Sequence, residues 1–144
     1  MIEITRLTPS DRDAWQDLWH AYMDFYERTL TPEAYERAWN GFLADDRIHA
    51  RAARIDGRLV GIVHFLVHAN TSADDVCYLQ DLFTASDVRG QGVGRKLIEA
   101  VVDWARAEGC FRVYWMTHET NTTARRLYDQ VAVNRGFIRY DITL

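Results

Sequence analysis

Three glycines, Gly90, Gly92 and Gly94, stand at alternate positions between a predicted strand and a predicted helix. Glycine tolerates positive φ angles and lets the backbone come close to a ligand. The first amides of a helix have no partner within it, and together with the helix dipole they attract anions. Three basic side chains flank the turn: Arg89, Arg95 and Lys96. We therefore expect the turn to bind a pyrophosphate or a similar anion.

The common glycine-rich phosphate motifs do not match this turn. A Walker loop requires Lys and then Ser or Thr after its last glycine, whereas Gly94 is followed by Arg95 and Lys96. A dinucleotide-binding fingerprint has the spacing GxGxxG near the start of a βαβ unit, and this turn has GxGxG beyond the middle of the chain. A glycine-rich turn with solvated arginines and no ligand is the remaining alternative.

A second pattern further along the chain extends the first. Asn121-Thr-Thr-Ala-Arg-Arg-Leu-Tyr128 has the spacing NxxAxxxY, and Gly136-Phe137 follows it. Together with the stretch from Leu82 to Gly94, this ordered set resembles the GCN5-related N-acetyltransferase (GNAT) superfamily. Its central motif is [RQ]xxGx[GA]. The resemblance covers roughly residues 76–144 and implies transfer of an acetyl group from acetyl-CoA to an amine, with no metal.

The resemblance also implies where acetyl-CoA binds. The backbone of three β residues would pair with the pantetheine arm, the glycine turn would surround the pyrophosphate, and two residues of the later helix would line the arm. The expected contacts are Leu82, Phe83, Thr84, Arg89, Gly90, Gln91, Gly92, Val93, Gly94, Arg95, Asn121, Ala124 and Tyr128. Because the arm must enter between strands, we expect 76–84 and 112–116 to separate at their C-terminal ends, with a bulge in the former.

Attack of an amine on a thioester expels a thiolate, which a nearby acid can protonate. Tyr128 is the expected acid, because the resemblance places it beside the thioester sulfur. A tyrosine that only packs on an amphipathic helix is the alternative. A backbone N–H near Phe83 would meet the oxyanion.

The amine must lose a proton, because a lysine-like ammonium has a pKa of about 10.4. Asp81 and Glu119 are the candidate bases, with a histidine or an ordered water also open. The stretch 78–84 is similar to polyamine acetyltransferases, which usually have Glu where this chain has Gln80. Gln80 can only orient water or the amine. Asp81 would point to the opposite face of the strand unless a bulge intervenes.

The acceptor site is expected from the family architecture at the end of the first helix and after the strand 112–116. This implies substrate contacts from Tyr22, Tyr26, Glu27, Gln80 and His118. Asp24, Glu27, Asp81 and Glu119 could together attract a cationic amine, although scattered carboxylates are more often a solvated face. His64 and His68 share one face of a strand, but no third metal ligand accompanies them.

The elements that position these residues follow from periodicity and turn signals. A first strand is expected over Ile2–Leu7. Helices are expected to start at Thr8-Pro9 and Thr31-Pro32, and the second should end at Gly41. The expected buried face of the first helix consists of Ala14, Leu18, Ala21, Tyr22 and Phe25. The further elements are a hairpin of 48–55 and 59–69 around Asp56-Gly57, a strand 76–84, a helix ending near Gly109, a strand 112–116, a helix 122–131 and a last strand 137–143. The fold class is α+β, a mixed, mostly antiparallel sheet of six or seven strands with four helices.

The length and composition indicate one compact domain, and the resemblance implies that residues 1–144 form a single acetyltransferase domain. The chain is 48% hydrophobic with a net charge of −4, so we expect no binding to nucleic acid or membranes. Cys77 and Cys110 are expected to be buried free thiols. The start MIEITRL lacks the pattern of a leader peptide, and we expect a cytoplasmic protein. The resemblance permits a homodimer without requiring one. A silent acyl-CoA-binding module and a protein-lysine acetyltransferase are the alternative functions.

Overall fold

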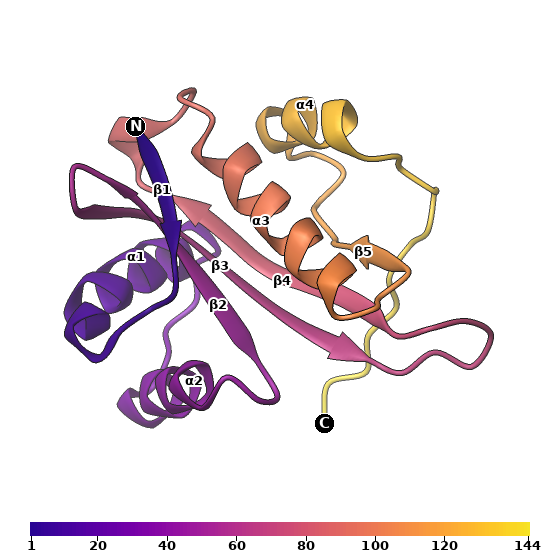
Figure 1. Ribbon diagram of the computed structural model, residues 1–144, viewed down its shortest axis with the longest axis horizontal. Helices are drawn as coiled ribbons and strands as arrows, with labels where there is room; N and C mark the ends of the chain where they lie inside the picture. Colours follow the sequence, from indigo (N-terminus) through magenta and orange to yellow (C-terminus); the bar gives the residue numbers. More distant parts are fainter.

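The computed structural model describes residues 1–144, which form five strands and four α-helices (Figure 1). The elements in chain order are β1 (Ile2–Thr5), α1 (Arg12–Phe25), α2 (Pro32–Ala44), β2 (His49–Ile55), β3 (Arg58–His68), β4 (Val76–Thr84), α3 (Val93–Ala107), β5 (Arg112–Tyr114) and α4 (Thr122–Val131), with short 3-10 helices η1 (Pro9–Asp11) and η2 (Ser86–Val88). None of the helices has both the length and the apolar character needed to span a membrane.

The five strands form one sheet in the order β1-β2-β3-β4-β5. The first three pairings are antiparallel, and β4 and β5 run parallel, so the predicted mixed, mostly antiparallel sheet is confirmed. The connection between β2 and β3 is the predicted two-residue turn, with positive φ at both Asp56 (50°) and Gly57 (80°). This combination defines the type I′ turn that matches the twist of a hairpin.

The predicted count of six or seven strands is wrong, because the expected strand 137–143 has no partner in the sheet. The chain after α4 is extended and exposed. The exposed fractions of Ile138, Tyr140 and Ile142 are 75%, 88% and 90%. A strand requires a neighbouring edge for its backbone hydrogen bonds, and this segment does not lie in register with β5. Figure 1 shows it as the yellow stretch that ends at the C-terminus.

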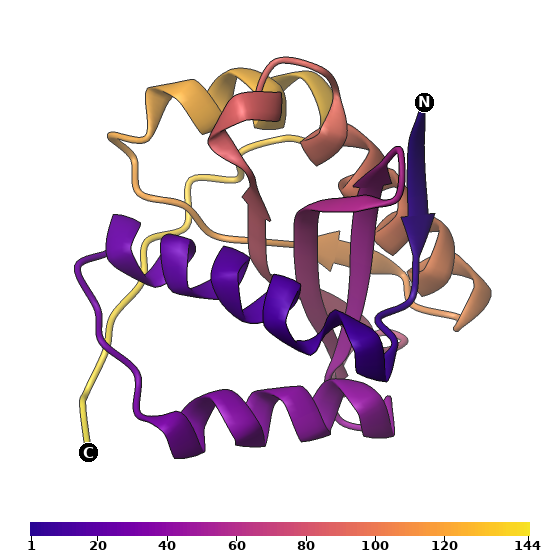
Figure 2. The same cartoon turned by 90° about the vertical axis from the view of Figure 1, so that its left-hand side faces the viewer.

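Helices cover both faces of the sheet (Figure 2). One face packs under α1 and α2, with a core that includes Trp15, Trp39 and Ile62. The other packs under α3, with a core that includes Phe65 and Leu97 and with α4 against its margin.

The buried face of α1 differs from the predicted one. Trp15, Trp19 and Met23 are buried, whereas Phe25 is exposed. Both sets of residues recur at helical spacing, so periodicity alone did not separate them. The indole rings bury the larger apolar area, and they therefore face the sheet.

Gly41 lies inside α2 rather than at its end. The helix continues to Ala44 and ends at Asp45, which adopts a left-handed conformation with φ of 52°. A Cβ on Gly41 would lie 2.5 Å from Cδ1 of Ile48. The glycine therefore allows the chain after the helix to pack closely against it.

Candidate functional site

Strand β4 contains a β-bulge at Gln80. His64 of β3 lies opposite Asp81, and Phe65 lies opposite Leu79, which leaves Gln80 without a partner. One extra residue shifts the alternation of side chains along the strand. The predicted bulge is confirmed, and it places the Asp81 side chain next to His64, on the α1 face of the sheet.

The hydrogen bonds of His64 fix its tautomer. The Nε1–H group of Trp15 donates to Nε2 of His64 at 3.1 Å. Because an indole N–H can only donate, Nε2 must accept and carries no proton. The proton of the neutral ring is therefore on Nδ1, which donates to Oδ2 of Asp81 at 3.1 Å. Trp15, His64 and Asp81 thus form a directed chain of hydrogen bonds.

Tyr22 of α1 lies at the centre of the predicted acceptor region. Its ring centroid is 5.4 Å from that of Phe83 and 5.0 Å from that of Tyr26. Burial raises the pKa of the Tyr22 phenol, and the nearby groups of Asp81, Tyr26 and Tyr128 raise it further. The same phenol is therefore close to both the candidate base and the candidate acid.

Strands β4 and β5 separate after a short pairing. Their register extends only over three pairs, from Val76 with Arg112 to Tyr78 with Tyr114. Strand β4 then continues to Thr84, whereas β5 ends at Tyr114, two residues before its predicted end. The predicted separation is confirmed. It leaves the β5-side edge of β4, including Leu82–Thr84, without a strand partner and able to hydrogen-bond an extended ligand.

The glycine turn leaves the N-terminus of α3 open. Gly92 is the N-cap residue with φ of 86°, no side chain caps the helix, and its first turn has no acidic residue. Gly90 also has positive φ, of 82°, and no atom lies within 4 Å of a Cβ placed on either glycine. The turn thus presents unpaired amides beside open space, which suits a pyrophosphate.

Both arginines beside this turn contact other side chains of the protein. Arg89 lies over the ring of Phe83, at 5.9 Å from its centroid, and Arg95 donates to the side chain of Gln130 in α4. Gly94 lies where α3 approaches α4, since a Cβ on it would be 3.3 Å from Cδ2 of Leu127. Gln91 is exposed in the turn, and Val93 is buried below it.

Helix α4 presents Tyr128 to the site. Its ring packs edge-on against Trp115, with centroids 5.4 Å apart. Burial raises the pKa of Tyr128, and the neighbouring Tyr26 adds to the shift, so the phenol keeps its proton at neutral pH. Asn121 is the N-cap of this helix: its side chain accepts from the amide of Ala124 and donates to Thr117 at 3.1 Å. Ala124 is half-buried.

The end of α1 meets the loop after β5. The ring centroids of Tyr26 and His118 are 6.0 Å apart, so two predicted substrate contacts are brought together. Glu27 follows Tyr26 with φ of 55°, and Glu119 follows His118. Both carboxylate residues are exposed. Asp24, by contrast, pairs with His20 at 3.4 Å on the outer side of the helix.

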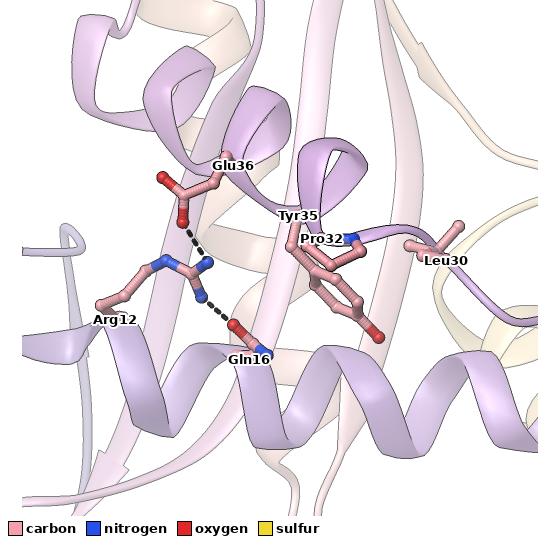
Figure 3. A pocket seen from close by; sticks show the side chains of 6 residues that line it. All are labelled: Arg12, Gln16, Leu30, Pro32, Tyr35 and Glu36. Atoms are coloured by element: carbon pink, nitrogen blue, oxygen red, sulfur yellow. Dashed lines mark hydrogen bonds and ion pairs between the residues drawn. The ribbon is translucent and has the colours of Figure 1, made fainter.

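A surface pocket between α1 and α2 is separate from this region (Figure 3). Arg12 occupies it and bonds to Gln16 and Glu36, which ties the two helices together. The pocket lining contains none of the predicted site residues. It is therefore an ion-pair contact between the helices and not part of the candidate site.

The structure adds His64 and Trp15 to the candidate site through their hydrogen bonds to Asp81 and to each other. The sequence pattern pairs His64 only with His68, which the structure instead bonds to the hydroxyl of Tyr114 at 2.9 Å. No group of three potential metal ligands is present. Only the bulge at Gln80 sets His64 opposite Asp81, and the sequence has no signal that fixes the register at that point. Cys77 is a buried free thiol as predicted, whereas Cys110 is partly exposed.

Comparison with known proteins identifies the class of this fold and site. The model of the acetyltransferase (GNAT) family matches residues 15–132. The chain belongs to this family, and it is an acetyl-CoA-dependent N-acetyltransferase.

Relatives act on different small amines. The chain is 32% identical to the D-amino-acid N-acetyltransferase HPA3 of Saccharomyces cerevisiae, over 96% of this chain and 89% of that protein. It is 26% identical to an aminoglycoside N(6')-acetyltransferase type 1 of Serratia marcescens, over 78% of this chain and 80% of that protein. The structure of AAC(6')-Iy with a CoA bisubstrate analogue has the same fold, with a TM-score of 0.87 and 17% sequence identity. The match covers 100% of this chain and 99% of that chain.

Proposed function

We propose that the protein acetylates a primary amine on a small cationic molecule, with Asp81 as the general base and Tyr128 as the general acid. The observation that favours this function is the bulge at Gln80, which places Asp81 on the α1 face of the sheet, where Tyr22 of α1 packs on Phe83 of the same strand. These groups lie on α1, β4 and α4, around the point where β4 and β5 separate. A base and an acid on either side of one opening suit direct transfer between two bound substrates.

The donor would bind along β4 and α3. The open amides of residues 90–95 and the charge of Arg89 suit the pyrophosphate, and the unpaired edge of Leu82–Thr84 suits the amide groups of the pantetheine arm. Val93 would support the turn from below. Ala124, at the start of α4, would line the arm, and Asn121 would hold this helix end in place.

Asp81 would take the proton of the ammonium group, directly or through an ordered water that Gln80 orients at the bulge. The amine then attacks the acetyl carbonyl, and the C–S bond breaks as Tyr128 gives its proton to the departing thiolate. The proton that the new amide nitrogen loses returns to the Tyr128 phenolate. A thiol has a pKa of about 8.5, so its thiolate is a modest base that a positioned phenol can protonate. Glu119 is the less favoured base, because it is exposed and has no partner that would orient its carboxylate.

A cationic acceptor suits the charges at the mouth of the site. Glu27 and Glu119 adjoin the Tyr26–His118 contact, and Asp81 lies deeper, near Tyr22. The named relatives act on D-amino acids and on aminoglycosides, which are small molecules with amino groups. We therefore place the acceptor among basic amino acids, polyamines and aminoglycosides.

Release of free thiol from acetyl-CoA tests the proposal directly. The panel contains polyamines, basic amino acids of both configurations, an aminoglycoside, neutral amines and a histone-like peptide, each at two salt concentrations. We expect the small cationic amines to give the highest kcat/KM, with a KM that rises with salt because screening weakens attraction beyond about 8–10 Å. A preference for neutral or anionic acceptors, or for the peptide, would contradict the substrate class.

We also propose that the protein forms a homodimer through its C-terminal segment. Ile138, Tyr140 and Ile142 alternate with polar residues, as in a strand with one apolar face, and all three are exposed. The outer edge of β5 has no partner in the same chain. A second copy supplies both an edge and a matching segment, so two chains could complete each other by a two-fold exchange.

A further inference from the structure

We propose that Trp15 and His64 are positioning residues that hold Asp81 as a charged, correctly aimed base. The inference rests on the proposed function, in which Asp81 takes the proton of the amine. It assigns a role to two buried side chains that belong to the α1 and β3 layers rather than to the substrate region.

The chain of hydrogen bonds has a single direction. Trp15 donates to Nε2 of His64, and Nδ1 of His64 donates to Oδ2 of Asp81, each at 3.1 Å. If Nε2 of His64 carried a proton, its N–H group would face the N–H group of Trp15 at 3.1 Å with no acceptor between them. His64 is therefore held neutral, and it can donate to Asp81 but cannot accept the proton that Asp81 receives.

The surroundings of His64 prevent the ring from turning. It is 4% exposed, stacks on Phe42 with centroids 4.2 Å apart, and meets Trp19 edge-on at 4.8 Å. These two neighbours are apolar, so the protonation state of the ring is set by its hydrogen bonds to Trp15 and Asp81. The ring is thus locked in both orientation and tautomer.

The consequence for Asp81 is a carboxylate with one fixed oxygen. Oδ2 is held by His64, so Oδ1 is left to receive a proton from the acceptor side. A hydrogen bond from a neutral donor stabilises the charged form of a carboxylate. The other titratable groups that face Asp81 are Tyr22 from α1 and Tyr78 from β4 itself, and both are neutral phenols at pH 7.

Heteronuclear NMR of the histidine ring nitrogens of the whole protein tests the tautomer without reference to activity. His64 is assigned by the signal that disappears in His64→Asn. We expect a protonated Nδ1 and a bare Nε2 in the native protein, and we expect Trp15→Phe to shift the resonance of Nε2, because the hydrogen bond to that atom is lost. A native ring protonated at Nε2, or a Trp15→Phe spectrum like that of the native protein, would overturn the inference.

The kinetic test compares two replacements of His64. The amide of His64→Asn can still donate to Asp81 from the position of Nδ1, whereas His64→Leu cannot. We expect His64→Leu to lose at least tenfold in kcat/KM and to move the acid limb of the pH profile upward, because the carboxylate loses a hydrogen bond that stabilises its charged form. His64→Asn should keep kcat/KM within about threefold and leave the limb in place.

Equal losses in the two variants, or an unmoved acid limb in His64→Leu, would show a packing role and overturn the inference. Failure of the proposed function gives a different result. If Asp81→Asn keeps native activity, Asp81 is not the base. If Asp81→Asn is inactive while the limb of His64→Leu does not move, the base is correct and the positioning role is wrong.

Discussion

Tyr128 and Trp115 pack edge to face, with ring centroids 5.4 Å apart, and this contact joins α4 to the chain that leaves β5. It holds the phenol at the point where β4 and β5 have separated. The Tyr128 side chain is half-buried in this position. Its raised pKa, caused by burial, keeps the proton in place until a base arrives.

Replacement of Tyr128 by Phe should lower kcat at least tenfold and leave the affinity for acetyl-CoA nearly unchanged. A positioned general acid typically contributes about 10²–10⁴-fold, whereas removal of a hydroxyl from a packing tyrosine costs little activity. Steady-state kinetics and calorimetry of coenzyme binding measure the two quantities. Tyr26→Phe, at the neighbouring ring, is the matched control and should change KM for the amine more than kcat. A native kcat in Tyr128→Phe would show that Tyr128 only packs in the protein and is not the general acid.

Replacement of Gly92 by Val should abolish detectable binding of acetyl-CoA in calorimetry. The φ of 86° strains any β-branched residue, so the amides at the start of α3 would be displaced. Gly109 is the control, because it has φ of 82° just beyond the other end of the same helix and has no atom within 4 Å of a Cβ. Gly109→Val should lose similar stability and bind the coenzyme normally. Equal affinities in the two variants would contradict the assignment of the turn.

The pH dependence of stability should reveal the ion pair of Asp11 with Arg54. Burial alone would raise the pKa of Asp11, but hydrogen bonds from Arg54 at 2.7 Å and from Thr8 at 2.8 Å outweigh burial and lower it. A lowered pKa in the folded state means that the contribution is complete above the unfolded value, about 3.9, and is lost as the pH falls through the folded value.

Asp11→Asn should therefore reduce the free energy of unfolding at pH 7 by about 2–3 kcal/mol, as expected for a buried charged hydrogen bond. The difference from the native protein should begin to shrink below about pH 4, where Asp11 of the unfolded chain takes up a proton while folded Asp11 stays charged to lower pH. Urea unfolding at pH 7 and pH 3 measures both values. The exposed Asp17 provides a control, since Asp17→Asn should change stability by less than about 0.5 kcal/mol. A loss that is the same at both pH values would contradict the ion-pair explanation.

The molar mass in solution tests the proposed exchange of C-terminal segments. Light scattering should give twice the chain mass of 16.8 kDa, and the double variant Ile138→Asp, Ile142→Asp should give 16.8 kDa. Thr143→Asp lies on the polar face of the same segment and should remain a dimer. A native monomer, or a dimer that persists in the double variant, would contradict the exchange.

The helices and strands that follow strong local signals were predictable from the sequence. Strand β4 and helix α4 have the predicted bounds, and the Asp56-Gly57 turn has the expected left-handed angles. These features depend on residues that are close in the chain. The glycine turn was also predictable from local sequence, because the conformations of Gly90 and Gly92 are set by residues close in the chain.

The features that were not predictable depend on contacts between distant segments. The bulge at Gln80 is a property of the pairing of β4 with β3, and it decides which face receives Asp81. The choice between two apolar faces of α1 depends on how Trp15 fits against the sheet. The last predicted strand has the right alternation, but no strand of the sheet pairs with it. The local pattern does not specify any of these outcomes.

The most direct test of the account is the pH dependence of acetyl transfer by Asp81→Asn, measured with the best acceptor of the amine panel. The account predicts a loss of kcat/KM of at least about 100-fold at pH 7 and a partial recovery near pH 9.5, where free amine accumulates without a base. Asp24→Asn, which removes a carboxylate of the outer helix surface, should retain native activity. Activity of Asp81→Asn within twofold of the native enzyme at pH 7 would contradict the account.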